Sequence, residues 1–271
     1  MKKVLLRILL ILAVILVVAG IGYVGYGIYK KATLNIPNPV ATMEIEDYGT
    51  VKIELYPDMA PNTVTNFIRL ANRGFYNGLT FHRTIPNFMA QGGAKGGDGS
   101  SSPSLSDILD DVETDKNYNI PGEFIANGYT KNTLKHEKGV ISMARGNYEQ
   151  YGGEATIGGY NSAGSQFFIM TSDNPTLDGA YAAFGKVTEG YDIIEKISKV
   201  EVHYRQEELK EGQEAPKDKD GNQIASDTPK KQPVIKSLSV ETYGVDYGVP
   251  ETNDVFDIYT WWMQQYGLTG Y

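Results

Sequence analysis

The sequence of 271 residues contains no cysteine, and this absence excludes both a disulfide framework and a cysteine nucleophile. Histidine is scarce: His82, His136 and His203 are scattered, without an HExxH motif or acidic residues at ligand spacing. The sequence therefore predicts no metal site. Residues 218–222 resemble the start of a calcium loop, but Pro229 stands where such a loop needs glutamate, which favours a hairpin turn.

Acidic residues are absent from residues 1–31, which carry five basic residues and hence a charge of +5. The whole chain has a net charge of −8, so the remainder carries −13 (−8 minus +5). A strongly acidic remainder argues against nucleic acid as a partner, because the phosphate backbone attracts basic surfaces.

Charged residues are also absent from residues 8–29, an apolar segment of 22 residues. A helix of this length spans a hydrocarbon core of about 30 Å. Basic residues flank it on both sides, three before and two after. We therefore predict that residues 1–31 form a single membrane anchor and that the rest of the chain is extracytoplasmic. A cleaved signal peptide, which would give a secreted protein, is the alternative, although the segment has only a poor cleavage site.

Beyond a predicted linker at residues 32–40, alternating apolar and polar residues predict β-strands, as at Val51, Ile53 and Leu55. Helical spacing of apolar residues predicts an amphipathic helix that opens at Pro61 and a second at residues 191–197. Many strands and two short helices indicate a mainly β protein, a closed antiparallel barrel. The predicted strands are residues 41–46, 50–56, 81–85, 88–91, 140–144, 166–171, 183–187 and 234–240.

Three segments fall outside this pattern. Residues 94–119 are rich in Gly, Ser, Asp and Pro, which predicts a long surface loop with one helical turn at residues 105–110. Residues 200–231 are highly charged and predict a projecting hairpin or a flexible insertion. Residues 242–271 form an aromatic C-terminal tail.

The tail is expected to contain a short amphipathic helix that docks on the barrel or on a partner. A helix at the membrane interface is the alternative, weakened by the absence of Lys and Arg. Because helical neighbours lie about 100° apart, we expect Trp262 rather than Trp261 to be buried. The shared face would consist of Val255, Tyr259, Trp262 and Tyr266.

Two motifs, at residues 81–93 and 165–169, combine one arginine, two glutamines and several apolar side chains without a nucleophile, a base or a metal ligand. This set suits rotation about a bond. Amide resonance opposes rotation of a peptide bond by about 18–20 kcal/mol. A fixed guanidinium such as Arg83 stabilises the twisted amide without proton transfer. Gln91, from a neighbouring strand, is expected to orient Arg83.

The motifs FHRTIPNFMAQGG (81–93), GVISMAR (139–145), SQFFIMT (165–171) and LDGAYAAFGKV (177–187) closely resemble the cyclophilins. The resemblance covers residues 41–241. It implies an eight-stranded antiparallel barrel capped by two helices, and peptidyl-prolyl cis/trans isomerisation without a cofactor. It also implies that Arg83 is catalytic, and His82 beside it is expected to be a supporting hydrogen-bonder. The implied substrate-binding residues are Phe88, Met89, Gln91, Ala144, Arg145, Gln166, Phe168, Leu177 and Tyr181.

Two positions depart from the family pattern. Thr176 stands where cyclosporin-sensitive members carry tryptophan, which implies weak cyclosporin binding. Arg145 stands where asparagine is common, so a contact to the substrate backbone would come from the main chain.

The combined prediction is a membrane-anchored prolyl isomerase that assists the folding of exported or surface proteins, its partners being proline-containing polypeptides. One anchor and no cysteine are typical of a Gram-positive bacterium. The alternative from another functional class is a cyclophilin-like chaperone or tether that binds peptides with little turnover.

Overall fold

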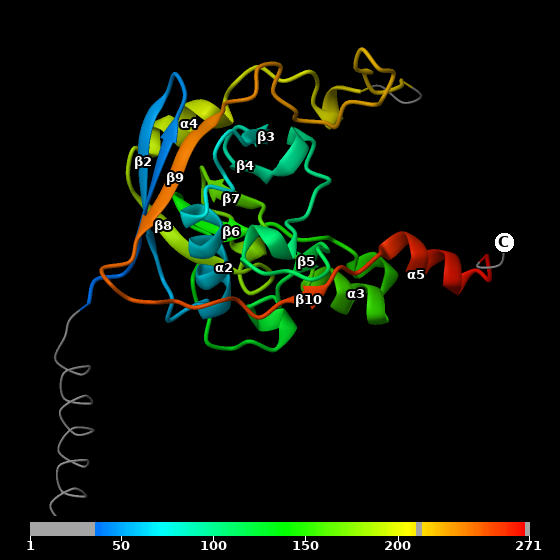
Figure 1. Ribbon diagram of the computed structural model, residues 1–271. Helices are drawn as coiled ribbons and strands as arrows, with labels where there is room; N and C mark the ends of the chain where they lie inside the picture. Colours follow the sequence, from blue (N-terminus) through cyan, green and yellow to red (C-terminus); the bar gives the residue numbers. More distant parts are fainter. Residues whose placement is uncertain (1–35, 210–212, 269–271) are drawn as a thin grey trace, which may run out of the picture. The chain divides into compact units, whose positions relative to one another are not determined.

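The computed structural model describes residues 36–268 except 210–212 (Figure 1). The predicted anchor at residues 1–31 lies outside these described residues, as do residues 32–35 of the predicted linker. Within them, no helix is both long and apolar enough to cross a membrane. Asn38–Tyr271 is one compact unit, and the description below concerns this unit.

Eight antiparallel strands form one curled sheet, with the order β3-β4-β7-β6-β8-β2-β1-β9 (Figure 1). The ends of each strand lie within two residues of their predicted positions, except that β4 extends three residues beyond its predicted end at residue 91. The bounds are β1 Val40–Ile45, β2 Gly49–Leu55, β3 Thr80–Ile85, β4 Met89–Ala94, β6 Val140–Met143, β7 Phe167–Met170, β8 Ala183–Glu189 and β9 Ile235–Glu241.

The two end strands of this sheet, β3 and β9, meet through a short contact. A single antiparallel bridge joins Thr80 to Val234. The backbone N–H of Gly78 donates to the carbonyl of Ile235 (2.7 Å), and Ile235 donates in turn to Leu79 (2.7 Å). No strand ladder runs between β3 and β9 in the described part of the chain, so the closed barrel of the prediction is not seen. The fold is an eight-stranded curled sheet.

The β1–β2 hairpin shows why the sequence pattern was informative. Val51, Ile53 and Leu55 are fully buried, whereas the charged residues between them are half-buried. In the turn, Asp47 and Gly49 have positive φ angles of 65° and 117°, which aspartate and glycine tolerate better than most residues.

The two predicted helices are α2, Pro61–Asn72, and α4, Tyr191–Ser198. Helix α2 packs against β9, and α4 packs against β2, β3 and β4. Both bury the apolar face that their sequences predicted: Phe67 of α2 and Ile194 of α4 are fully buried.

The core is built around five aromatic rings in mutual contact. Ring centroids lie 5.2 to 6.1 Å apart, in tilted or edge-to-face arrangements that suit the aromatic quadrupole. All five residues are fully buried, among them Phe67 and Phe167. The others are Tyr76, Phe81 and Phe184.

Several elements had no sequence prediction. They include helix α3, Gly153–Tyr160, and a two-stranded sheet of β5, Tyr118–Asn119, with β10, Asn253–Asp254. Among the short 3-10 turns, η2 Leu105–Asp107 lies within the helical turn predicted at residues 105–110. The turns without a prediction are η1 Lys95–Gly97, η3 Ile125–Asn127, η4 Glu149–Tyr151, η5 Pro175–Leu177 and η6 Gln206–Glu208. Residues 94–119 are also more than the predicted surface loop, because Ile108 and Tyr118 are buried in the core.

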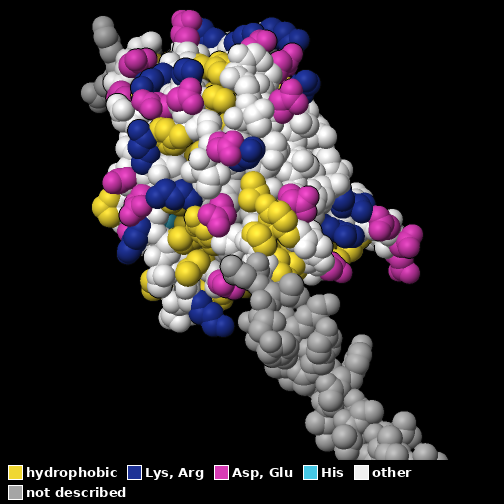
Figure 2. Space-filling model, turned by 90° about the vertical axis from the view of Figure 1, so that its left-hand side faces the viewer, with side chains coloured by type: hydrophobic (Ala, Val, Ile, Leu, Met, Phe, Trp, Pro, Cys, Tyr) yellow, Lys and Arg dark blue, Asp and Glu magenta, His cyan; other side chains and the backbone are white. Residues whose placement is uncertain are grey.

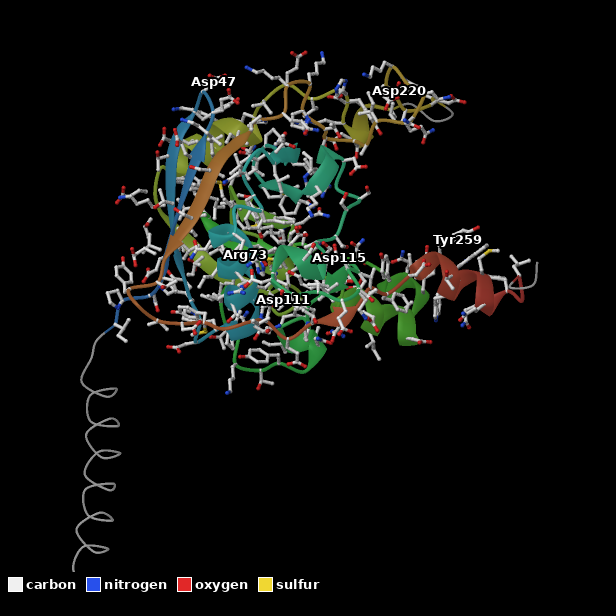
Figure 3. All side chains as sticks on the ribbon, in the orientation of Figure 1. Asp47, Arg73, Asp111, Asp115, Asp220 and Tyr259 are labelled. Atoms are coloured by element: carbon white, nitrogen blue, oxygen red, sulfur yellow. The ribbon has the colours of Figure 1, made fainter. Side chains whose placement is uncertain are left out.

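The C-terminal tail forms the predicted helix, α5, Ile258–Gln265, but the predicted buried face is wrong. Trp262 is 37% exposed and Tyr259 67% exposed; Figure 3 shows Tyr259 on α5. Trp261 instead contacts Tyr151 (6.2 Å between ring centroids) and Phe256 (6.5 Å).

The described residues of 200–231, which exclude 210–212, form the predicted projecting hairpin. Bridges join Val202 to Pro229 at its base and Lys217 to Gln223 near its tip. The turn at residues 218–222 is held by hydrogen bonds to the Asp218 carboxylate. Figure 3 shows Asp220 at the outer end of this segment.

The surface over the sheet carries both signs of charge. Figure 2 shows acidic and basic side chains interspersed on this face. Ion pairs link neighbouring strands, such as Lys236 with Glu44 (2.7 Å) and Lys52 with Glu189 (3.0 Å). The acidic residues that give the chain its negative net charge therefore do not form a single negative patch on this face.

Candidate active site

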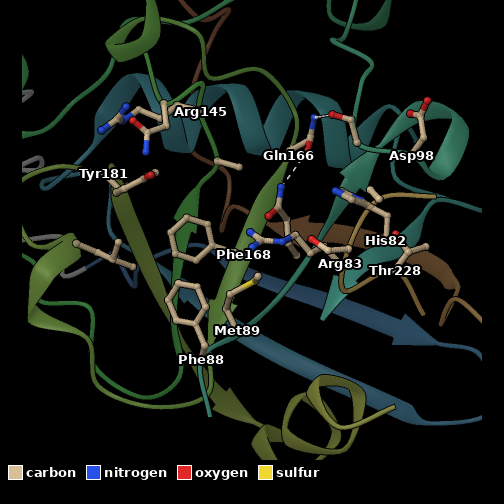
Figure 4. A pocket seen from close by; sticks show the side chains of 17 residues that line it. His82, Arg83, Phe88, Met89, Asp98, Arg145, Gln166, Phe168, Tyr181 and Thr228 are labelled. Carbon is tan, nitrogen blue, oxygen red and sulfur yellow. Dashed lines mark hydrogen bonds between the residues drawn. The ribbon is translucent and has the colours of Figure 1, made fainter. Parts of the chain in front are cut away.

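A cavity of about 410 Å³ lies on the outer side of the sheet at β3, β4 and β7 (Figure 4). All eleven residues that the sequence proposed for the site line this cavity. Those eleven are His82, Arg83, Phe88, Met89, Gln91, Ala144, Arg145, Gln166, Phe168, Leu177 and Tyr181. The sequence missed six further lining residues: Asp98, Gly99, Asn147, Ala225, Ser226 and Thr228.

Strand register brings the two motifs together. Arg83 of β3 lies opposite Gln91 of β4, and Gln91 lies opposite Phe168 of β7. Because side chains alternate between the faces of a strand, Phe167 enters the aromatic core while Phe168 points to the cavity. One row across three strands thus presents a cation, an amide and an aromatic ring.

The polar half of the cavity contains a chain of amides. Gln91 Nε2 donates to Gln166 Oε1 (3.1 Å), and Gln166 Nε2 donates to the carbonyl of Gly99 (2.8 Å), as Figure 4 shows. The loop after β4 is thereby tied to β7. These bonds order Gln91 toward Gln166 rather than toward Arg83.

Arg83 has a different partner from the one the sequence suggested. Its Nε lies 3.6 Å from Asp227 Oδ2, and its side chain is 43% exposed. No hydrogen bond joins Arg83 to Gln91 in the part of the chain that the structure describes, although the two residues face each other on paired strands, so orientation of Arg83 by Gln91 stays a prediction. Asp227 comes from the 200–231 hairpin, which also contributes Ala225 and Ser226 to the cavity.

His82 lies beside Arg83 and is 5% exposed. Neither ring nitrogen forms a hydrogen bond of ordinary geometry among the described residues, although the Gln166 side chain and the Thr80 backbone lie near enough to act on the pKa of His82. Burial lowers the pKa of His82 to about 4; nearby Asp98 opposes this effect and the charge of Arg83 adds to it. The imidazole is therefore neutral at pH 7.

The apolar half of the cavity is formed by Phe88, Met89, Phe168, Leu177 and Tyr181. These residues belong to a second small hydrophobic cluster outside the main core. Tyr181 meets Phe168 edge to face, with ring centroids 5.7 Å apart. The cluster offers a firm wall for an aliphatic ring.

His136 supports this wall from behind. Its ring stacks on Phe168 with centroids 6.1 Å apart, and its Nε2 lies 3.1 Å from Ser142 Oγ. Its Nδ1 lies 3.3 Å from the Asp178 carboxylate. Burial lowers the pKa of His136, although Asp178 opposes this shift. Sequence reasoning missed the contribution of His136, because its partners are far from it along the chain.

Arg145 lines the cavity, but its side chain is committed to the protein itself. The guanidinium donates to the carbonyls of Ala180 (2.9 Å) and Gly146 (2.8 Å) and to the Glu149 carboxylate (2.6 Å). It also stacks on the Tyr181 ring at 4.4 Å. Arg145 therefore fixes Tyr181 in place, and its side chain is 3% exposed.

The cavity combines a half-exposed guanidinium with an apolar pocket. Arg83 offers N–H donors and a charge, and the aromatic half offers burial of an apolar ring. No group of three or more His, Cys, Asp or Glu suited to a metal ion occurs among the described residues. This arrangement suits electrostatic stabilisation of a bound amide rather than bond cleavage.

Comparison with known proteins agrees with the geometry. The family described as cyclophilin type peptidyl-prolyl cis-trans isomerase matches residues 40–221. Peptidyl-prolyl cis-trans isomerase B of Bacillus subtilis is 39% identical over 158 residues, which cover 58% of this chain and 90% of that protein. A peptidyl-prolyl cis-trans isomerase of Helicobacter pylori is 35% identical over 181 residues, covering 61% of this chain and 93% of that protein.

A similar fold is known from a crystal structure of a Cryptosporidium parvum cyclophilin type peptidyl-prolyl cis-trans isomerase, determined in the presence of the dipeptide Ala-Pro. The match has a TM-score of 0.52 and 26% sequence identity, and it covers 74% of this chain and 98% of that one. The hairpin residues beyond 221, the tail and the first 39 residues all lie outside the family match.

Proposed function

The chain belongs to the cyclophilin-type peptidyl-prolyl cis-trans isomerases, and from this premise we propose that Arg83 is its catalytic residue. The observation that supports this role is the row of Arg83, Gln91 and Phe168 across three paired strands. A proline ring held against Phe168 would place its amide beside the guanidinium. The eleven cavity residues named from the sequence would then form the substrate site.

The proposed mechanism stabilises the twisted amide more than either planar isomer. For an X–Pro bond the isomers differ by about 0.5–1 kcal/mol, whereas the barrier between them is about 18–20 kcal/mol. Twisting removes resonance, so the prolyl nitrogen becomes a better acceptor. A donor from Arg83 would strengthen only in that twisted state, which is the condition for a faster reaction.

We propose further that the clients are exported or surface proteins and that the chain is anchored in the membrane with its isomerase unit outside. The support is the apolar segment at residues 8–29 with its basic flanks. The acidic remainder of the chain would keep the isomerase unit away from anionic lipid. Proline-containing polypeptides are the proposed partners.

The role of Arg83 is tested with the full-length protein and a peptide that contains Ala-Pro, the dipeptide named for the C. parvum relative. Cis/trans exchange is measured by NMR. Arg83→Ala should slow catalysed exchange by about a hundredfold or more, as expected for loss of a preorganised donor, while the unfolding transition stays unchanged. Arg83→Lys should not restore the rate, because an ammonium group lacks the planar fork.

Arg73→Ala is the matched control. Arg73 is bound to Asp110 on the loop side of α2, and it does not line the cavity. This variant should keep full activity. Wild-type turnover by a folded Arg83→Ala protein would contradict the mechanism. A wild-type protein that binds the peptide without accelerating exchange would instead favour the chaperone or tether.

A further inference from the structure

The carboxylate of Asp227 lies between two arginines at the edge of the cavity. Its Oδ2 is 3.6 Å from Arg83 Nε, and its Oδ1 is 3.0 Å from Arg205 Nη1. The Asp227 side chain is 8% exposed and that of Arg205 is 16% exposed, so this pair is largely removed from water, whereas the Arg83 side chain is 43% exposed. Because little water surrounds the Asp227–Arg205 pair, its charges attract each other more strongly than the charges of a surface ion pair.

The backbone around Asp227 holds the carboxylate in place. The Asp227 carbonyl accepts a hydrogen bond from the N–H of Thr84 (3.0 Å), the residue after Arg83. Arg205 Nη1 donates to the Thr84 carbonyl (3.0 Å). The N–H of Asp227 donates to Tyr204 (3.0 Å), and Asp227 has a φ of 61°. The base of the hairpin is thus docked on β3 beside the arginine.

The contact with Asp227 engages one edge of the guanidinium. Nε faces the carboxylate, and the two Nη groups of Arg83 form no hydrogen bond within the described residues. A carboxylate alone would offset the charge of Arg83. Arg205 supplies a second positive charge, so the three groups together keep a net charge of +1. The cluster can therefore orient Arg83 and leave a cationic face toward the cavity.

Building on the proposed role of Arg83, we infer that Asp227 is a positioning residue for catalysis and that the 200–231 hairpin completes the active site. Asp227 holds the Nε edge so that the Nη donors face the amide of the bound peptide. The family match ends at residue 221, so Asp227 belongs to a part of the chain outside the family pattern. Asp227 contacts the Arg83 guanidinium directly, whereas the Gln91 amide donates its hydrogen bond to Gln166.

The test compares Asp227→Asn, Asp227→Glu and Asp220→Asn in the full-length protein, with kcat and KM measured separately. Asp227→Asn keeps the shape and removes the charge. We expect kcat to fall about tenfold with KM changed less than twofold, and Asp227→Glu to recover part of the loss. Asp220→Asn makes the same change at the exposed outer end of the hairpin and should have wild-type kinetics.

A double-mutant cycle separates positioning from a structural role. In an Arg83→Ala background, Asp227→Asn should cause no further loss of kcat. The same tenfold loss in both backgrounds would overturn the inference, and so would wild-type kcat in folded Asp227→Asn. Failure of the proposed function has a different signature, namely an Arg83→Ala protein that is itself fully active.

A spectroscopic measurement covers the case in which Asp227→Asn loosens the hairpin. The ¹⁵Nε–H resonance of Arg83, assigned by its absence in Arg83→Ala, should shift in Asp227→Asn and return toward its original position in Asp227→Glu. An Arg83 resonance that is unaffected by Asp227→Asn would overturn the inference.

Discussion

At the residue scale, the most unusual side chain of the site is His82. It is buried beside Arg83 without a hydrogen bond of ordinary geometry among the described residues. A buried polar group without a partner costs free energy, and a second charge next to Arg83 would cost more. The neutral His82 imidazole therefore contributes a flat, uncharged surface to the lining of the cavity.

This state of His82 predicts a loss of stability in acid. The folded-state pKa is about 4, below the ordinary value of 6.5, so between these values the unfolded chain binds more protons. The free energy of unfolding should therefore fall as the pH drops from about 6.5 to about 4. One pKa unit corresponds to about 1.4 kcal/mol, so the loss approaches roughly 3 kcal/mol.

The measurement is urea unfolding of wild type and His82→Gln between pH 7 and pH 4.5. The glutamine variant should lose clearly less stability over this range, because it has no group that titrates there. His136 and the carboxylates remote from His82 contribute equally to both proteins and cancel in the comparison; the exception is Asp98, whose charge interacts with His82. Parallel pH profiles for the two proteins would show that His82 is not held neutral by the fold.

At the scale of elements, the tail shows how helices α3 and α5 depend on each other. A Cβ added to Gly158 of α3 would lie 2.4 Å from the Phe256 ring, so the glycine allows this ring to lie against the helix. Trp261 then packs on Phe256. Within the tail, the backbone carbonyl of Glu251 accepts a hydrogen bond from Asn62 Nδ2 (3.0 Å). The tail is therefore attached to the isomerase unit at several points.

These contacts predict that alanine substitutions at two adjacent tryptophans change the stability of the tail by different amounts. Trp261→Ala should destabilise the tail by about 1 kcal/mol, since it removes aromatic contacts worth about 0.5–1.5 kcal/mol each. Trp262→Ala should have little effect, because Trp262 packs on Tyr266 of its own helix at 4.7 Å. Hydrogen exchange of the α5 amides measures the difference. Equal protection in the two variants would contradict the packing described.

The N-terminus of α2 is capped by a residue that is distant in the sequence. Ala60 at the N-cap of α2 has no side-chain acceptor, so the first-turn N–H groups need another partner. The Glu123 carboxylate supplies it, accepting from the N–H groups of Asn62 (3.0 Å) and Thr63 (2.7 Å). The loop between β4 and β6 thereby becomes part of the fold rather than a surface appendage.

At the scale of the whole molecule, charge and hydropathy divide the chain into a basic apolar start and an acidic remainder. The proposed anchor predicts that the full-length protein stays in the membrane fraction through a high-salt wash and begins at or near Met1. Protease added outside intact cells should digest the isomerase unit. A secreted form that begins near Ile21 or Tyr23 would instead support a cleaved signal peptide.

The sequence by itself determined the eight strands of the main sheet, the helices α2 and α4 and, through its resemblance to the cyclophilins, the eleven cavity residues. These features depend on local periodicity and on long motifs, and register follows once one face of each strand must be buried. The glycines of residues 153–160 hid helix α3, since three of its eight residues are glycine and low helix propensity predicts a loop.

Only the tertiary structure decided which partners meet across the chain. Asp227 reaches Arg83 from 144 positions further along the sequence, and His136 stacks on Phe168 from the opposite side of the pocket wall. Trp261 rather than Trp262 faces the protein for the same reason. A helix pattern shows which residues share a face, but docking decides which face is covered, because burial depends on contacts with segments that local sequence does not encode.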